Sequence, residues 1–274
     1  MNTSEYLAFL GALENSNRTL LCGYCGYEIA SIGKSCICTN CESPVFSARR
    51  EFEARNHTLL EALDSIAAYA RDRRYDDAIA GYEKLIALNK DPYLMHAEAL
   101  LYLQYSNYEL AKIQYDRPGF MEENALHRDK SAKLASSSKR LLAKGISAAE
   151  SEISNGNNSS LTLYSLFLCQ MRLEDYRGAQ ESLKELKSGP KYLSSYASML
   201  FHIGIGHYDA AIADAETLLN EKSFSVNALF YIGFSKFKKG QARDAKKILS
   251  ALSRVLSNES VEALLKEIAE QEST

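Results

Sequence analysis

The sequence lacks tryptophan, contains only four prolines in 274 residues, and carries a net charge of −3. Few prolines, together with long stretches rich in alanine and leucine, favour helix. A net charge this close to zero excludes a strong overall attraction to nucleic acid or membrane surfaces. No apolar run reaches the ~18 residues that a membrane-spanning helix needs, and the start MNTSEYLAFLGALENSN lacks the positive region of a signal peptide. We therefore expect a cytoplasmic protein without a membrane span.

Five of the six cysteines gather in the stretch CGYCGYEIASIGKSCICTNC. Cys22 and Cys25 form one C-x-x-C pair, and Cys38 and Cys41 form a second. A reducing cytoplasm disfavours disulfides, and redox chemistry at one C-x-x-C does not need a second pair close by. The pattern predicts four thiolates around one Zn²⁺, which is structural because four protein ligands leave no open coordination position. Cys36 is the alternative ligand in place of Cys38.

The cysteine stretch resembles a zinc ribbon, a small hairpin structure held together by its metal. The resemblance covers residues 20–48 and implies short β-strands with structural Zn²⁺ as the cofactor. Lys34 is the only basic residue between the first cysteine and residue 48, and Glu28 and Glu42 oppose it. Phosphate binding needs several cations on one face, so nucleic-acid binding by the ribbon is the minor hypothesis.

The rest of the sequence repeats a motif in which alanine follows tyrosine by three positions. Tyr75–Ala78, Tyr108–Ala111, Tyr176–Ala179 and Tyr208–Ala211 share it, and Ala242–Ala245 carries alanine in the tyrosine position. Successive copies are about 34 residues apart, or twice that distance. Apolar residues at spacings of three and four flank the motifs, which is typical of amphipathic helices.

This pattern resembles the tetratricopeptide repeat (TPR), in which each copy is a pair of antiparallel helices, A and B. The resemblance implies a mainly α solenoid of helical hairpins. Gly233 in the last copy and Ala99 in the second occupy the small position where the two helices touch, whereas Phe167 and Met199 replace it in the third and fourth copies. The motif alanines are expected to let the B helices approach closely.

The domain organisation follows from these two resemblances. Between the second and third copies we expect either a degenerate helix pair or one long helix from Glu122 to Ile153, ended by the breaker NGNNSS. We also expect a closing helix over 259–271. The predicted parts are a short amphipathic helix at 1–19, the zinc ribbon at 20–50, a first set of TPR-like repeats at 57–154, a linker or bend at 155–160, and a second set with its capping helix at 161–274.

In the resembled family the A helices line a concave groove. The resemblance places an apolar ladder in that groove, formed by Tyr164, Leu168, Tyr196, Leu200, Phe230 and Phe234. An exposed apolar surface of this size needs an occupant. That occupant is a foreign protein segment, a terminal helix of the same chain, or a second copy. The expected function is therefore a non-enzymatic adaptor or scaffold for a protein partner.

A cationic run in the last copy supports an alternative function. It consists of Lys238, Lys239, Arg243, Lys246 and Lys247. Such a run is usually a solvated helix face, but an anion contact would make the chain a nucleic-acid-associated regulator that uses this face with the ribbon. The sequence contains no phosphate loop, nucleophile elbow or paired metal-binding histidines, so we expect no enzyme. Cys169, among apolar neighbours, is predicted to be a buried, inert thiol.

Overall fold

A computed structural model describes residues 18–21, 28–31, 35–37, 44–46, 62–63, 65–88, 90–113, 121–189, 191–219, 225–255 and 259–272. Within these residues the chain is mainly α-helical, as predicted. Residues 1–17 of the predicted helix at 1–19 lie outside the described residues. Of the helices in the described part, none combines the length and apolar character needed to cross a membrane.

Four short strands form two separate antiparallel pairs. The strands β1 (Arg18–Leu21) and β2 (Glu28–Ser31) pair with Arg18 opposite Ser31. The strands β3 (Ser35–Ile37) and β4 (Pro44–Phe46) pair with Ser35 opposite Phe46. Each pair is therefore a two-stranded hairpin in the part of the chain where the ribbon was expected.

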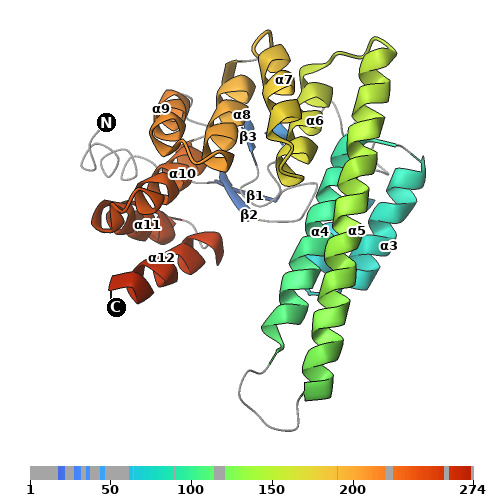
Figure 1. Cartoon of the computed structure of the whole chain (residues 1–274), viewed down its shortest axis with the longest axis horizontal. Helices are drawn as coiled ribbons and strands as arrows, with labels where there is room; N and C mark the ends of the chain where they lie inside the picture. Colours follow the sequence, from blue (N-terminus) through green and yellow to red (C-terminus); the bar gives the residue numbers. More distant parts are fainter. Residues whose placement is uncertain are drawn as a thin grey trace. The chain divides into compact units, whose positions relative to one another are not determined.

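The helices occupy the rest of the described chain (Figure 1). Residues 62–63 and 65–71 are helical and precede the first labelled helix. The labelled helices are α3 (Tyr75–Leu88), α4 (Pro92–Ala111), α5 (Met121–Ser154), α6 (Ser160–Arg172), α7 (Tyr176–Leu186), α8 (Lys191–Gly204), α9 (Tyr208–Leu219), α10 (Ser225–Lys238), α11 (Ala242–Val255) and α12 (Glu259–Glu272). They divide into an N-terminal helical unit that ends at Ser182 and a C-terminal helical unit that begins at Leu183, inside α7.

Four helical hairpins are closed by the same turn. Arg73, Glu174, Gly206 and Gly240 have φ angles of 60°, 60°, 76° and 77°, and each lies two residues before the second helix of its hairpin. The N–H of each donates to the carbonyl three residues back, and the next N–H donates to the carbonyl five residues back. This left-handed helix end satisfies the last carbonyls of the first helix and reverses the chain. The same left-handed end also closes α5 at Gly156, with a φ of 88°, but among the described residues only the four hairpins combine it with a second helix that starts two residues later.

The motif alanines of these four hairpins are buried where the two helices meet. Ala78, Ala179, Ala211 and Ala245 are each at most 1% exposed. A side chain larger than alanine has no room at such a contact. At Gly233 on α10, an added Cβ would lie 2.8 Å from Cγ of Leu249 on α11. The predicted close approach of these two helices is therefore confirmed.

The second copy of the motif is not a hairpin, and the prediction of a B helix there is wrong. Tyr108–Ala111 forms the last turn of α4, and Ala111 is exposed. Ser106 occupies the position that corresponds to the turn residue of the four hairpins, but Ser106 itself is helical and buried. Its hydroxyl lies 2.7 Å from the hydroxyl of Ser131 on α5. Packing against α5 thus extends α4 through the motif.

The sequence between the second and third copies of the motif forms one long helix, which was one of the two alternatives predicted for it. α5 runs over 34 residues and ends at Ser154. Ser159 caps α6, because its hydroxyl accepts a hydrogen bond from the N–H of Thr162 at 3.1 Å. The helix break predicted at 155–160 therefore lies between α5 and α6, although Ser160 already begins α6, and α12 covers the residues of the predicted closing helix. The predicted limits of the two repeat sets stay a prediction, since the compact units divide later, at Ser182.

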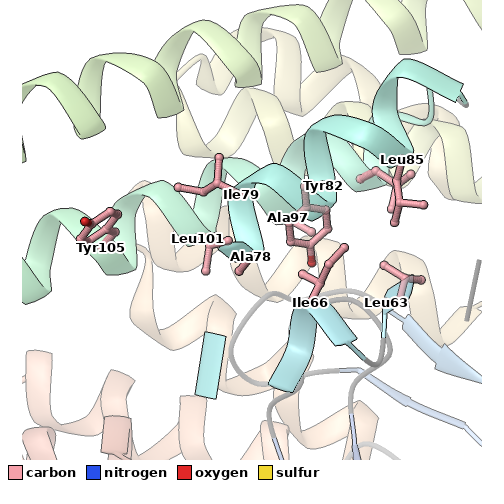
Figure 2. Packing of buried hydrophobic residues seen from close by; sticks show 10 residues of the cluster. Leu63, Ile66, Ala78, Ile79, Tyr82, Leu85, Ala97, Leu101 and Tyr105 are labelled. Atoms are coloured by element: carbon pink, nitrogen blue, oxygen red, sulfur yellow. The ribbon is translucent and has the colours of Figure 1, made fainter. Parts of the chain in front are cut away.

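Each helical unit has its own core. Figure 2 shows the core beside α3 and α4, where the ring of Tyr82 lies among the side chains of Ile66, Ala97 and Leu101. Tyr82 is 1% exposed. In the C-terminal helical unit, buried side chains line α8, α10 and α11 in the same way, with Ile248 at 0% exposure. Burial of this kind supplies most of the stability of helical repeats.

Candidate functional site

The four predicted zinc ligands lie outside the described residues. Cys22 and Cys25 fall in the sequence between β1 and β2, and Cys38 and Cys41 fall between β3 and β4. Cys36 belongs to β3. Among the side chains that the structure describes, no group of three or more His, Cys, Asp or Glu could hold a metal ion. The zinc site therefore stays a prediction.

The apolar ladder predicted to line an open groove is mostly interior. Tyr164, Leu168 and Tyr196 are 0% exposed, and Leu200 is 7% exposed. Only Phe230 and Phe234 are half-buried. The repeat spacing places such residues on one face of the A helices, but it does not determine whether that face is covered. The expectation that all six side chains are exposed does not hold for the first four.

The contacts of Tyr196 illustrate this interior packing. Its hydroxyl accepts a hydrogen bond from Nδ2 of Asn227 at 3.2 Å, and Asn227 is itself 1% exposed. The ring of Tyr231 packs edge-on against Tyr196 with the centroids 6.1 Å apart. A buried hydroxyl with a buried amide partner stabilises the unit and leaves little surface for a ligand.

The predicted cationic run is partly neutralised by nearby carboxylates. Nζ of Lys238 lies 3.2 Å from Glu267 on α12 and also sits over the ring of Phe237. Lys239 pairs with Asp209 on α9. Lys246 also has an interaction partner. The run thus links α10 to neighbouring helices in addition to facing solvent. Two further members, Arg243 and Lys247, are exposed.

A cleft that the sequence analysis did not predict lies in the N-terminal helical unit, where the turn before α3 meets the end of α4 and the start of α5. Its volume is about 270 Å³. Tyrosines and charged side chains dominate the lining, which consists of Arg73, Arg74, Tyr75, Asp76, Asp77, Tyr105, Tyr108, Glu109, Lys112 and Lys130. We call it the tyrosine–cation cleft.

Aromatic rings organise the tyrosine–cation cleft. The ring of Tyr75 stacks on Tyr105 with centroids 4.8 Å apart and planes 18° from parallel, and it lies 5.6 Å from Tyr108. Two cations approach the ring of Tyr108: Cζ of Arg73 at 5.5 Å and Nζ of Lys112 at 4.2 Å from the centroid. Both distances fall within the range of cation–π attraction.

Glu109 is the buried centre of the charge network in the cleft. Its side chain is 2% exposed, and it contacts Nζ of Lys112 at 3.1 Å, Nζ of Lys130 at 3.2 Å and Nδ1 of His127 at 2.6 Å. Burial alone raises the pKa of Glu109. The hydrogen bonds from His127, Lys112 and Lys130 outweigh burial and hold the pKa below its usual value. The lowered pKa favours the charged form of Glu109, which pairs with two lysines at the cleft wall.

The other carboxylates of the cleft also have partners. The hydroxyl of Tyr105 donates to Asp76 at 3.2 Å, and Arg74 pairs with Asp77 at 2.8 Å. Lys130 donates to the hydroxyl of Tyr105. Four cations face three carboxylates in the lining, so one positive charge is in excess. Arg73 forms no ion pair with another described residue; its recorded contact is the ring of Tyr108.

Two further chemical groups outside the cleft have structural explanations. Cys169 is 0% exposed, and burial raises the pKa of its thiol to about 12, which confirms the predicted inert cysteine. On α9, one oxygen of Asp214 accepts a hydrogen bond from Ser198 at 2.8 Å and lies 2.7 Å from Nδ1 of His202. The serine contacts the aspartate and not the histidine, so this cluster lacks the arrangement of a nucleophile activated by a base.

No protein-family model, curated protein or solved structure matches this chain. Functional assignment therefore depends on the geometry of the chain itself.

Proposed function

We propose that this chain is a non-enzymatic adaptor or scaffold, a TPR-like array of helical hairpins that binds a segment of a protein partner. The observation that carries the proposal is the recurrence of one left-handed turn and one buried alanine in four hairpins. Arrays of equivalent hairpins present extended surfaces, and their usual role is to bind other proteins.

The exposure of the side chains limits where on the chain a partner can bind. The interior part of the apolar ladder is unsuitable because Tyr164, Leu168 and Tyr196 are fully buried. Phe230 and Phe234 on α10 keep part of their rings accessible in the C-terminal helical unit. The tyrosine–cation cleft offers donors and aromatic surface in the N-terminal helical unit. Tyrosine and arginine are the side chains that most often carry binding energy at protein interfaces.

A structural Zn²⁺ at the N-terminal segment is part of the same proposal. The two strand pairs each enclose one C-x-x-C in the sequence that joins them: Cys22 and Cys25 in the first, Cys38 and Cys41 in the second. Each pair of thiolates would supply half of a tetrahedral site. The metal would stabilise strands too short to form a core of their own.

Replacement of Cys22 by serine tests the metal. We expect a full-length wild-type chain purified without chelator to contain one zinc, and the variant to lose it while helical circular dichroism changes little. Elemental mass spectrometry measures the metal, and a Cys36→Ser variant is the control. Full zinc retention in Cys22→Ser contradicts the site, and zinc loss in Cys36→Ser but not in Cys38→Ser changes the ligand set.

Reconstitution with a purified partner tests the adaptor. Proteins captured from native lysate by the immobilised full-length chain are produced separately, and their binding is measured by calorimetry. We expect a defined stoichiometry and little loss of affinity at raised salt. A nucleic-acid-associated regulator would instead bind RNA or DNA with an affinity that falls steeply with salt. Failure of every captured candidate to bind when purified contradicts the adaptor.

A further inference from the structure

We propose that the tyrosine–cation cleft binds an acidic segment of the partner protein, with a carboxylate of that segment in reach of Arg73 and Lys112 at the ring of Tyr108. The inference rests on the proposed adaptor function and names the chemistry of its partner. Three observations support it: the charge balance of the lining, the meeting of two cations at one ring, and the position of Arg73 in its turn.

The charge balance favours an anionic ligand. Every carboxylate in the lining already has a partner, since Asp76 accepts from Tyr105, Asp77 pairs with Arg74, and Glu109 holds three donors. Lys112 uses one of its donors on Glu109, and a lysine ammonium has three. Four cations against three carboxylates leave one positive charge in excess in the lining, and the donors of Arg73 and Lys112 complement a carboxylate.

The meeting of Arg73 and Lys112 at Tyr108 defines the place. The two side chains come from different elements, the turn before α3 and the end of α4, and both approach the same ring. A carboxylate that reaches the ring of Tyr108 would therefore meet positive charge from two different elements. Glu109 does not neutralise Arg73, because its partners are Lys112, His127 and Lys130.

The position of Arg73 is costly for an arginine. Its φ of 60° lies in the left-handed region, where two of the three equivalent turn positions, Gly206 and Gly240, carry glycine. The third equivalent position, Glu174, also carries a side chain at a φ of 60°, so the chain accepts the cost of this conformation, about 1 kcal/mol, in two of its turns. The guanidinium placed against Tyr108 at the cleft is the feature that this turn has and the glycine turns lack.

The size of the cleft selects a peptide over a nucleic acid. About 270 Å³ is slightly less than the roughly 300–1,000 Å³ of typical small-molecule pockets. One or two side chains of an extended segment fit this space. A run of phosphates needs several uncompensated cations on one face, whereas the lining has one positive charge in excess, which matches a single carboxylate.

A pair of synthetic peptides tests the inference on the full-length, zinc-loaded chain. The first is a short fluorescein-labelled peptide that alternates glutamate with glycine, and the second carries glutamine in place of glutamate. We expect the glutamate peptide to bind in a fluorescence anisotropy titration and the glutamine peptide to bind at least about tenfold more weakly. A single-stranded RNA of equal length is the third probe.

Variants at Arg73 assign the binding to the cleft. Arg73→Gly removes the guanidinium but keeps the residue that two equivalent turns carry, so the fold is retained. We expect it to weaken the glutamate peptide about five- to tenfold, and Arg73→Glu to abolish binding. Arg177→Ala is the matched control, because Arg177 is exposed on another hairpin and outside the cleft. It should change affinity by less than about twofold.

Each outcome decides the inference. Equal binding of the two peptides, or unchanged binding in both Arg73 variants, overturns it, as does tighter binding of RNA than of the glutamate peptide. These failures differ from a failure of the adaptor. If a purified partner binds the wild-type chain and the Arg73→Glu variant equally well, the adaptor stands and the acidic-segment site is wrong.

Discussion

The four hairpins bury small motif alanines and uncharged polar groups, whereas α4, where it packs against α5, also buries glutamates and a histidine. In the hairpins, a motif alanine is buried at the helix crossing, as at Ala211 and Ala245. The described parts of α4 and α5 bury two glutamates and a histidine, Glu98, Glu109 and His96, besides Ser106, Ser131 and Ser138, whereas the buried polar residues of the hairpins are all uncharged: Thr162, Ser165, Gln170, Ser182, Asn227 and Ser235. Small residues permit close packing that is insensitive to pH, while buried polar groups depend on their partners.

This difference coincides with the location of the candidate site. The tyrosine–cation cleft forms where α4 runs past its motif instead of turning, so that Tyr105, Tyr108 and Glu109 meet Lys130 of α5. Had the chain turned at Ser106, Tyr108 and Glu109 would lie on a short second helix. A break in the regular hairpin pattern thus creates a site with charges and rings, and regular hairpins supply the support around it.

The largest effect should come from removing a ring at a regular A helix. Tyr196→Ala deletes a side chain with 0% exposure that Asn227 and Tyr231 contact. We expect the free energy of unfolding to fall by about 3–5 kcal/mol in chemical denaturation. Tyr196→Phe, the control, should cost only about 1 kcal/mol because it removes the hydrogen bond alone. A loss below about 1 kcal/mol in Tyr196→Ala would mean that the ladder is not interior packing.

The second-largest effect should be a pH dependence of stability that arises in α4 and α5 and not in the hairpins. Burial, with repulsion from Glu83 on α3, raises the pKa of Glu98 to about 7, although Lys144 on α5 opposes the shift. The folded chain holds a proton that the unfolded chain releases above about pH 4.5. Stability should therefore decrease as the pH rises from about 4.5 to about 7 and then level off.

Glu98→Gln removes this dependence. Near pH 8 the variant should be about 2–3 kcal/mol more stable than the wild-type chain, and near pH 4.5 the two should be similar. Urea denaturation across that range measures the difference. A variant that is equally stable or less stable than wild type at pH 8 contradicts a buried, protonated Glu98.

Local patterns predicted the hairpins but not the cleft. The start of α7 at Tyr176 and the burial of Ala179 follow from residues within one hairpin, which is why the motif succeeded there. The motif at Tyr108 failed because a long-range contact, Ser106 with Ser131 of α5, overrides the local tendency to turn.

Local sequence patterns were equally limited in predicting the candidate sites. Helical spacing predicted equivalent positions for Tyr164 and Tyr196 on their two helices, but periodicity cannot say whether a helix face is covered, and both side chains are buried. The cleft joins three elements separated in sequence, at Arg73, Tyr108 and Lys130. Its one local signal was the run of charges around two arginines just before Tyr75, and charge runs of this kind usually mark only a solvated surface.

A smaller effect should separate the buried motif alanines from the exposed one. Ala245→Leu inserts a larger side chain at a position with 0% exposure and should cost about 1–3 kcal/mol by overpacking. Ala111→Leu makes the same change at the exposed end of α4 and should stay within about 0.5 kcal/mol. Thermal and chemical denaturation compare the two. Equal losses would mean that the second motif also lies at a close helix contact.

The smallest effect should appear in the shared turn itself. Gly240→Ala places a Cβ at a φ of 77°, where the backbone conformation costs an alanine about 1 kcal/mol. Arg73→Gly relieves the same conformation in the first hairpin but loses the contact with Tyr108 and adds freedom to the unfolded chain, so its net change should be below about 0.5 kcal/mol. Paired urea titrations measure both variants. If Arg73→Gly proved as destabilising as Gly240→Ala, the arginine would be needed to hold its turn, and the four turns would be alike in backbone geometry but not in what stabilises them.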